Sequence, residues 1–422
     1  MKSIIVYILR VLTRLTLLRY KPRIVGITGS VGKTSTKEAV SAVLKDKFKI
    51  RSSQGNYNNE LGLPLAVLGE KTGGRNPVAW AAVILKSLAK LVASDYPDIL
   101  VLEMGSDRPG DIRYLLDLSG PLDCAVITTI GISHLEYFGS REELAKEKLT
   151  LLKGLARKGF AVLNFDDERV WNGRKSAKGD VIGYGFNPEA DVSASDFQII
   201  RHDDVYGVNF KILHRGTVVP FFLPQSLGKP AVYAALAAAA VGLGFGMNLV
   251  DVSEALRRNF NPPPGRLRLL SGIKRSWILD DTYNAAPAST VAALETLSIL
   301  GAGRKLAAIG QMAELGEASD EGHRQVAAKL LEIGAEAVFL VGGLSRIIKD
   351  ELEKLDFKGG VYWFETSDDA RLSVQEELRE GDTLLVKGSQ SARMEKIVKE
   401  IMADPEAAPR LLVRQSGEWE NR

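Results

Sequence analysis

The residues best suited to chemistry lie in a short glycine-rich segment, Thr28-Gly-Ser-Val-Gly-Lys-Thr-Ser35, which follows an apolar run and precedes a helical pattern. Glycine N–H groups and a helix N-terminus together bind phosphate. Lys33 can reach the β- and γ-phosphates of a nucleotide, and the Thr34 hydroxyl can ligate Mg²⁺. The segment predicts a phosphate loop of a short variant, since Ile27 stands where the general pattern has glycine; its residues are Gly29, Ser30, Val31, Gly32, Lys33, Thr34 and Ser35.

Three further polar side chains could act beside this loop. Glu103 ends an apolar run, Ile99–Glu103, and His134 follows another, Cys124–Thr129. The carboxyl ends of parallel strands are where α/β proteins place ligand-binding groups, and a carboxylate suits Mg²⁺. Lys148 lies in a mixed-charge helical pattern, which by itself is typical of a solvated lysine. Without other information, a strand-end glutamate is often an ion-pair partner and a lone histidine is usually structural.

Apolar runs typical of strands alternate with helical patterns along most of the chain, which predicts an α/β fold with parallel sheets. The segment Val192–Leu223 differs, because its short alternating runs predict an antiparallel insert. We expect a central P-loop-type ATPase domain and a C-terminal Rossmann-like domain. The strands are expected at Arg23–Thr28, Ile99–Glu103, Cys124–Thr129, Ala161–Phe165, Trp277–Asp280, Leu306–Ile309, Ala337–Val341, Val361–Phe364 and Thr383–Val386.

A proline-rich segment, Phe260-Asn-Pro-Pro-Pro-Gly-Arg266, marks the best domain boundary. Consecutive prolines cannot continue a helix and form a stiff extended linker. A chain of 422 residues is also too long for one ordinary core. The expected division is an N-terminal helix over 1–22, an ATP-binding domain over 23–263 and a C-terminal domain over 264–422.

The composition excludes several classes of function. The 55 basic and 52 acidic residues nearly balance, so nothing in the net charge of +3 indicates a nucleic-acid partner. Cys124 is the only cysteine, which excludes internal disulfides and thiolate metal clusters and suits a reducing cytoplasm.

Two segments invite comparison with membrane helices. Pro230–Val250 is uncharged but rich in alanine and glycine, which favours a buried helix followed by a turn. The N-terminal segment is interrupted by arginines and is therefore a poor membrane span and a poor signal peptide. Arg10, Arg14 and Lys21 share one face of a helix here. Such a basic amphipathic helix could lie on an anionic membrane surface or pack on the protein's own body, and both interpretations stay open.

The sequence resembles the Mur ligases, ATP-dependent amide-forming enzymes of cell-wall precursor synthesis, from about Arg23 to Ile401. Within that family it is most similar to the branch that adds D-alanyl-D-alanine. The resemblance is carried by the phosphate loop and by ordered motifs at Gly55–Pro64, Leu102–Gly105, Ile130–Glu136, Pro264–Arg266, Asp280–Pro287, Gly310–Gly316 and Val386–Ser389.

This resemblance implies a role for each candidate residue. Thr34, Glu103 and His134 match magnesium ligands, and Lys148 matches a carbamylated lysine that helps to hold the second of two Mg²⁺ ions; Lys146 is the neighbouring alternative. Burial near a metal would keep the lysine amine neutral, as carbamylation requires. Arg266 matches an arginine that reaches phosphate when the domains close. Residues near the nucleotide would include Tyr57, Asn58, Asn59, Asp281 and Asn284.

The implied reaction passes the γ-phosphoryl group of ATP to a substrate carboxylate, and an amine then attacks the acyl phosphate. The expected substrates are a UDP-N-acetylmuramoyl-tripeptide and D-alanyl-D-alanine, in the cytoplasm and with an N-terminal helix that could reach the inner face of the plasma membrane. Two alternatives stay open: a Mur-like ligase with a different carboxylate or amine, and an ATP-binding scaffold without catalysis. Whether the chain acts as a monomer or an oligomer is also open.

The sequence departs from the family pattern in two places. Only 22 residues precede the first expected strand, where the family has a domain that holds the UDP-sugar. In the helix after Gly228, the residues Pro230, Ala231 and Ala234 stand where the family usually has histidine and asparagines. The first departure leaves open how the uridine part is bound, and the second puts the usual adenine contacts in doubt.

Overall fold

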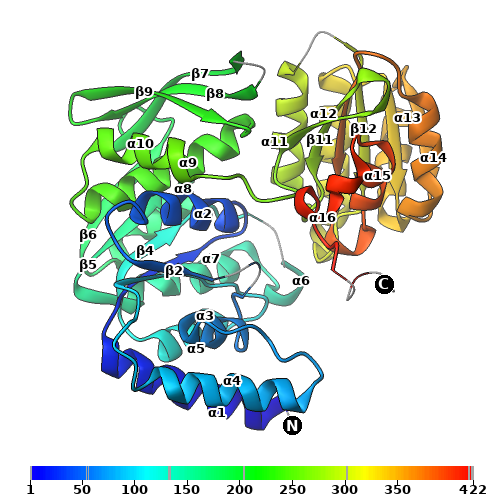
Figure 1. The fold of residues 1–422 in the computed structure, drawn as a ribbon. Helices are drawn as coiled ribbons and strands as arrows, with labels where there is room; N and C mark the ends of the chain where they lie inside the picture. Colours follow the sequence, from blue (N-terminus) through cyan, green and yellow to red (C-terminus); the bar gives the residue numbers. More distant parts are fainter. Residues whose placement is uncertain are drawn as a thin grey trace.

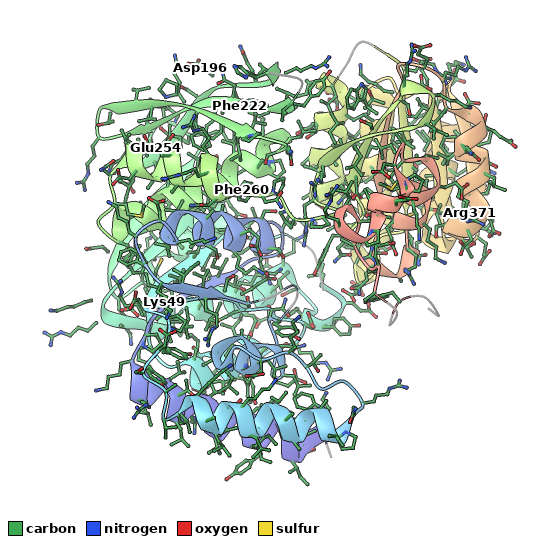
Figure 2. All side chains as sticks on the ribbon, viewed as in Figure 1. Lys49, Asp196, Phe222, Glu254, Phe260 and Arg371 are labelled. Carbon is green, nitrogen blue, oxygen red and sulfur yellow. The ribbon has the colours of Figure 1, made fainter. Side chains whose placement is uncertain are left out.

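The computed structural model describes residues 2–53, 55, 57–131, 135–202, 205–300, 303–416 and 419. Two β-sheets, each covered by helices, form two lobes that are joined by the proline-rich segment (Figure 1). Figure 2 shows Phe260 where the chain leaves the first lobe for the second. The expected α/β fold is confirmed.

The first sheet has nine strands in the order β2-β3-β1-β4-β5-β6-β7-β8-β9. Pairing is parallel from β2 to β7 and antiparallel from β7 to β9, so the expected antiparallel insert is present but continues the main sheet. The strands are β1 (Arg23–Thr28), β2 (Ile50–Ser52), β3 (Ile99–Glu103), β4 (Leu122–Ile127), β5 (Leu155–Asn164), β6 (Asp180–Gly185), β7 (Val192–His202), β8 (Val205–His214) and β9 (Thr217–Pro224).

Both faces of the sheet are buried along the central strands β1, β3 and β4, which explains why these strands are continuous apolar runs. Successive residues of β3 enter opposite cores: Ile99 and Val101 face one set of helices, and Leu100 and Leu102 face the other. The first set is α2 (Lys33–Leu44), α9 (Gly228–Gly244) and α10 (Leu249–Asn259). The second includes α3 (Gly62–Leu68), α5 (Asp111–Ser119), α7 (Arg141–Leu149) and α8 (Glu168–Asn172), with α6 (Leu135–Phe138) nearby.

Helix α9 is the buried helix expected around Pro230–Val250. Its alanines lie in the first core, where small side chains let it pack closely against α2. Across the part of the chain that the structure describes, no helix has both the length and the apolar character needed to cross a bilayer.

The second sheet has six strands in the order β10-β11-β15-β12-β13-β14, all parallel except for the β10–β11 pair. The strands are β10 (Arg268–Ser271), β11 (Trp277–Asp281), β12 (Lys305–Gly310), β13 (Ala337–Val341), β14 (Gly360–Phe364) and β15 (Thr383–Lys387). One face is covered by α11 (Pro287–Ile299), α12 (Ser319–Glu332) and α13 (Arg346–Lys354). The other is covered by α14 (Ser367–Glu377), α15 (Glu395–Ile401) and α16 (Ala408–Leu411).

The N-terminal helix α1 (Lys2–Tyr20) lies at the edge of the first lobe beside α4 (Pro77–Lys90) (Figure 1). Its residues Leu9 and Leu12 are buried in a small apolar cluster with side chains of α3 and α4. The interpretation in which this helix packs on the protein's own body is therefore correct for one of its faces.

The two lobes touch at several points besides the linker. A side chain at Gly228 would place its Cβ 2.2 Å from the Thr296 hydroxyl, so the start of α9 approaches α11 closely enough to require glycine. The rings of Tyr206 and Trp277 also pack edge to face across the junction, with their centres 5.4 Å apart.

Candidate active site

The phosphate loop between β1 and α2 is held in shape by the end of β4. Gly29 has a φ of 148°, and a Cβ there would lie 1.9 Å from the Thr128 hydroxyl, so only glycine fits. The Ser30 N–H donates to the Thr129 carbonyl at 2.7 Å, and the Thr128 hydroxyl donates to the Val31 carbonyl at 2.6 Å. Gly32 enters α2 with a φ of 87° and provides no side-chain cap, which leaves the positive end of the helix open to an anion.

The side chain of Lys33 folds back over this loop. Its ammonium donates to the Gly29 carbonyl at 2.7 Å and to the Ser30 carbonyl at 3.4 Å. Burial lowers the pKa of Lys33, and the nearby Glu103 carboxylate opposes that shift. The lysine is therefore a short side-chain rotation from any anion that enters the loop.

Glu103 ends β3 directly beside the loop and is buried. Its carboxylate accepts a hydrogen bond from the Thr34 hydroxyl at 3.1 Å and another from the Asn58 amide at 3.2 Å. The resemblance placed Asn58 and Asn59 in a loop near the nucleotide; both line the same cavity, but Asn59 uses its side-chain oxygen to accept from the Gly62 N–H at 2.9 Å. The sequence contains both asparagines side by side but does not indicate which of them contacts Glu103.

The structure separates the two candidate lysines of α7. Lys146 is exposed and pairs with Glu143, which raises its pKa. Lys148 is fully buried, and its ammonium contacts the Ser106 hydroxyl at 3.1 Å. Burial and then the charge of Lys33 lower the pKa of Lys148 to about 7. Much of this amine is therefore neutral near pH 7, which is the form that reacts with CO₂.

Glu147, which the sequence did not indicate, holds the loop that faces Lys148. Its two carboxylate oxygens accept from the Gly110 N–H at 2.9 Å and from the Ile112 N–H at 2.7 Å, at the start of α5. The same loop carries Ser106, the hydrogen-bond partner of Lys148. Glu147, the neighbour of Lys148 in α7, therefore helps to hold the loop on which that partner lies. Ser106 could have been suspected from its place just after the strand that ends at Glu103.

The second lobe brings Arg266 to the phosphate loop. The guanidinium lies 3.9 Å from the centre of the Tyr283 ring, and its Nη2 donates to the Thr34 hydroxyl at 3.4 Å. Among the described residues, Ser30 Oγ and Arg266 Nε are buried polar atoms without a hydrogen-bond partner. Both residues line the same cavity, and unpaired donors of this kind are what a bound anion such as phosphate would satisfy.

Asp281 and Asn284 lie at the end of β11 in the second lobe. Asp281 pairs with Lys387 across the sheet at 2.6 Å, and Lys387 also donates to the Asn284 carbonyl at 2.8 Å. Burial raises the pKa of Asp281, and the Lys387 charge opposes that change. The Asn284 amide oxygen is used locally, accepting from the Ala285 N–H at 2.9 Å. These contacts position the turn that carries Tyr283.

A cavity of about 1380 Å³ lies between the lobes and includes most of these groups. Its walls include the phosphate loop, Glu103, Arg266 and Asn284. A smaller cavity of about 60 Å³ adjoins the loop and is lined by residues that include Ser35 and Asp281. Pro230 and Ala231, two of the three residues that differ from the family pattern, also line it. The third, Ala234, is buried in the core.

The structure describes three of the four predicted magnesium-binding residues. Thr34 and Glu103 are in contact, and Lys148 is close enough to Lys33 for their charges to interact. His134 lies outside the described residues. Within the described part of the chain, no three His, Cys, Asp or Glu side chains are grouped for a metal. The Thr34 hydroxyl and the Glu103 carboxylate are nevertheless oxygen donors of the kind that suits Mg²⁺.

The fold and this junction define a two-lobed α/β protein with a phosphate-binding type of loop facing a cavity between the lobes. Residues 27–242 match the Mur ligase middle domain, and residues 265–390 match the Mur ligase glutamate ligase domain. The chain belongs to the Mur ligase family.

Similar proteins support this assignment. The UDP-N-acetylmuramoyl-tripeptide–D-alanyl-D-alanine ligase of Bacillus subtilis is 33% identical over 387 residues, covering 91% of this chain and 76% of the relative. The enzyme of that name from Escherichia coli is 31% identical over 380 residues, covering 89% and 76%. The crystal structure of MurF ligase from Thermotoga maritima in complex with ADP has a TM-score of 0.76 at 26% identity, covering 94% of this chain and 83% of that one.

Proposed function

We propose that this chain is an ATP-dependent ligase that joins D-alanyl-D-alanine to a UDP-N-acetylmuramoyl-tripeptide. The observation that carries the proposal is the meeting of Thr34, Glu103 and Arg266 at one cavity between the lobes. The relatives named for this reaction share about a third of their residues with the chain along most of its length. The structure of a MurF ligase in complex with ADP supports binding of an adenine nucleotide by this chain.

In this proposal the first lobe binds the phosphates of ATP. The N–H groups from Gly29 to Ser35 and the ammonium of Lys33 would hold the β- and γ-phosphates. Thr34, Glu103, His134 and a carbamylated Lys148 would hold two Mg²⁺ ions, which neutralise phosphate charge when bound. Three further residues would lie near the bound nucleotide without contacting the reacting groups: Asn59, Asp281 and Asn284.

The residues of the chain then favour transfer to a carboxylate. Arg266 faces the phosphate loop from the second lobe, where its charge can stabilise the phosphoryl group in transit. Transfer of that group gives an acyl phosphate and ADP. The amine of D-alanyl-D-alanine attacks the acyl carbon, and phosphate leaves as the amide forms. Closure of this junction over the substrates would exclude water that would otherwise hydrolyse the acyl phosphate.

We also propose the domain division behind this mechanism: an N-terminal helix over 1–22, an ATP-binding domain over 23–263 and a C-terminal domain over 264–422. Residues Pro262–Pro264 would act as the hinge, since Arg266 lies two residues after them and already reaches Thr34. We place the enzyme in the cytoplasm, at the inner face of the plasma membrane, with residues 1–21 in peripheral contact with the bilayer.

The proposed reaction can be tested with purified protein, ATP and Mg²⁺. We expect ADP release to depend on both the UDP-N-acetylmuramoyl-tripeptide and D-alanyl-D-alanine, and mass spectrometry to detect the pentapeptide product. Release with another carboxylate or amine, but not with this pair, would favour a Mur-like ligase of different specificity. Nucleotide binding without any acceptor-dependent release would favour the scaffold alternative.

Arg266→Ala is expected to lower kcat for ADP release by roughly 100-fold, because a phosphoryl group in transit would lose a positioned positive charge. Arg266→Lys should recover only part of the loss, since a lysine cannot reproduce the planar stacking on Tyr283. Steady-state kinetics with saturating ATP measure the effect. Arg275→Ala, an exposed arginine of the same lobe, is the matched control and should leave kcat unchanged. An Arg266→Ala enzyme within twofold of the unaltered rate contradicts the assignment.

A further inference from the structure

The edge of the first lobe that carries α1 and α4 has an unusual outer surface. Figure 1 shows both helices side by side along the lower edge of the first lobe. Each helix buries one side in a shared apolar cluster, formed by Leu9, Leu12, Leu65, Leu68, Trp80 and Val83. The Tyr20 hydroxyl, 2.5 Å from the Lys90 carbonyl, ties the C-terminal ends of the two helices together. Their other sides face solvent.

The outer side of α1 is as apolar as its buried side. Its exposed large side chains fall within an arc of about 80° at 100° per residue, and they are Ile4, Tyr7, Val11, Leu15 and Leu18. Ile4, Tyr7 and Leu18 are 65%, 69% and 70% exposed. The helix thus has two apolar faces, and only one of them is used by the fold.

The outer side of α4, which packs beside α1, is also apolar. Val78 and Leu85 are 75% and 67% exposed, and Val92, just beyond the helix, is 82% exposed. Of the eighteen large hydrophobic side chains that are exposed among the described residues, nine lie within 2–20 and 77–92, which is less than a tenth of the chain. Such concentration marks an interaction surface, because scattered exposed side chains would be spread evenly.

The charges around this surface indicate what covers it. Neither helix contains an aspartate or a glutamate, whereas α1 carries Lys2, Arg10, Arg14 and Arg19 and α4 carries Lys86 and Lys90. The nearby acids Glu60 and Glu70 are paired with Lys2 and Lys90. A second copy of the chain would bring the same cations against them and be repelled. An apolar strip flanked by cations fits a bilayer that contains anionic lipid.

We propose that the outer sides of α1 and α4, the α1–α4 face, together seat the protein on an anionic membrane surface. The inference extends the membrane placement in the proposed function, which concerned the N-terminal helix alone, by adding a second helix and a lipid class. The cavity between the lobes is lined in part by Lys2 of α1 and by Tyr114. The guanidinium of Arg10, also in α1, stacks over the Tyr114 ring. Docking would therefore hold one end of that cavity beside the lipid headgroups.

Deletion of α1 is a poor test, because it would uncover the cluster around Leu65 and Trp80. Exposed side chains can be changed instead without disturbing the core. Leu18→Gln combined with Leu85→Gln removes apolar area from both helices. The matched control combines Val250→Gln with Leu372→Gln, at positions that are 54% and 53% exposed elsewhere on the protein.

Vesicle flotation of the full chain tests the proposal, with phosphatidylcholine vesicles that contain either no anionic lipid or about 30% phosphatidylglycerol. We expect the chain to float with the anionic vesicles and to bind the neutral ones at least about tenfold more weakly. The Leu18→Gln/Leu85→Gln variant should bind the anionic vesicles at least about tenfold more weakly than the unaltered chain, and the control variant should match it.

Three results would overturn the proposal: no flotation, equal flotation of the two variants, or equal binding to both vesicle types. A dimer in lipid-free solution that the Leu18→Gln/Leu85→Gln change dissociates would show that a second copy covers the face, and would also overturn it. ADP release measured without vesicles should be the same for both variants. That measurement separates a failure of docking from a failure of the proposed ligase activity.

Discussion

Lys33→Ala is expected to reduce kcat for ADP release by about 1,000-fold, the largest effect of any single change in the first lobe. The ammonium lies over the phosphate loop, 2.7 Å from the Gly29 carbonyl, and no other lysine of α2 replaces it there. Lys37, one turn later, is committed to the Ser53 carbonyl at 2.6 Å. Loss of Lys33 therefore leaves the γ-phosphoryl group without its nearest positive side chain.

Coupled measurement of ADP release, together with calorimetric titration of ADP, checks this expectation. Binding should weaken much less than turnover, because the loop N–H groups would still hold phosphate. Lys45→Ala, which changes an exposed lysine at the end of the same helix, is the matched control and should be neutral. An Lys33→Ala enzyme that keeps a tenth of the rate would show that the loop does not hold a transferring phosphoryl group.

Lys148→Met is expected to lower kcat by roughly 100-fold and at the same time to stabilise the fold. The lost amine could no longer form a carbamate. Short carboxylates such as acetate should restore part of the rate to Lys148→Ala, which leaves space for them, but not to Lys148→Met. Lys146→Met, at the exposed lysine two residues earlier, is the control and should retain full activity.

The stability effect follows from the pKa of Lys148, which burial lowers from 10.5 to about 7. Between these values the unfolded chain binds more protons than the folded chain, so this residue's contribution to stability rises with pH and falls as pH decreases toward 7. In metal-free protein whose Lys148 is not carbamylated, Lys148→Met removes that penalty, and we expect a gain of roughly 2–4 kcal/mol at pH 7 that shrinks by pH 9. Urea unfolding at both pH values measures it, and a loss of stability at pH 7 would contradict the buried-amine assignment.

The sequence predicted the elements of the site better than the contacts between them. Strands such as β1 and β3 were evident because buried parallel strands are continuous apolar runs, and the phosphate loop was evident because only glycine tolerates its backbone. The short strand β2 and the strands β6 and β10 were not expected, since their pairing depends on neighbours distant in the chain.

The same limit applies to side chains. Burial distinguishes Lys148 from Lys146, and burial depends on how α7 packs, which the local pattern does not contain. Ser106 and Glu147 could not be assigned, and the contact of Asn58 with Glu103 could not be foreseen, because these roles are contacts between separate loops. For α1, the sequence offered two interpretations of one apolar face, and the structure shows two apolar faces.

The Thr34 hydroxyl is shared by both lobes: it donates to Glu103 and accepts from Arg266. A cation that took this oxygen as a ligand would compete with the arginine for the same lone pairs. Arrival of the metal–nucleotide pair would then release the guanidinium from the hydroxyl and leave it free to turn toward phosphate. Occupancy of the loop would in this way be sensed directly by the opposite lobe, without any relay through the sheets.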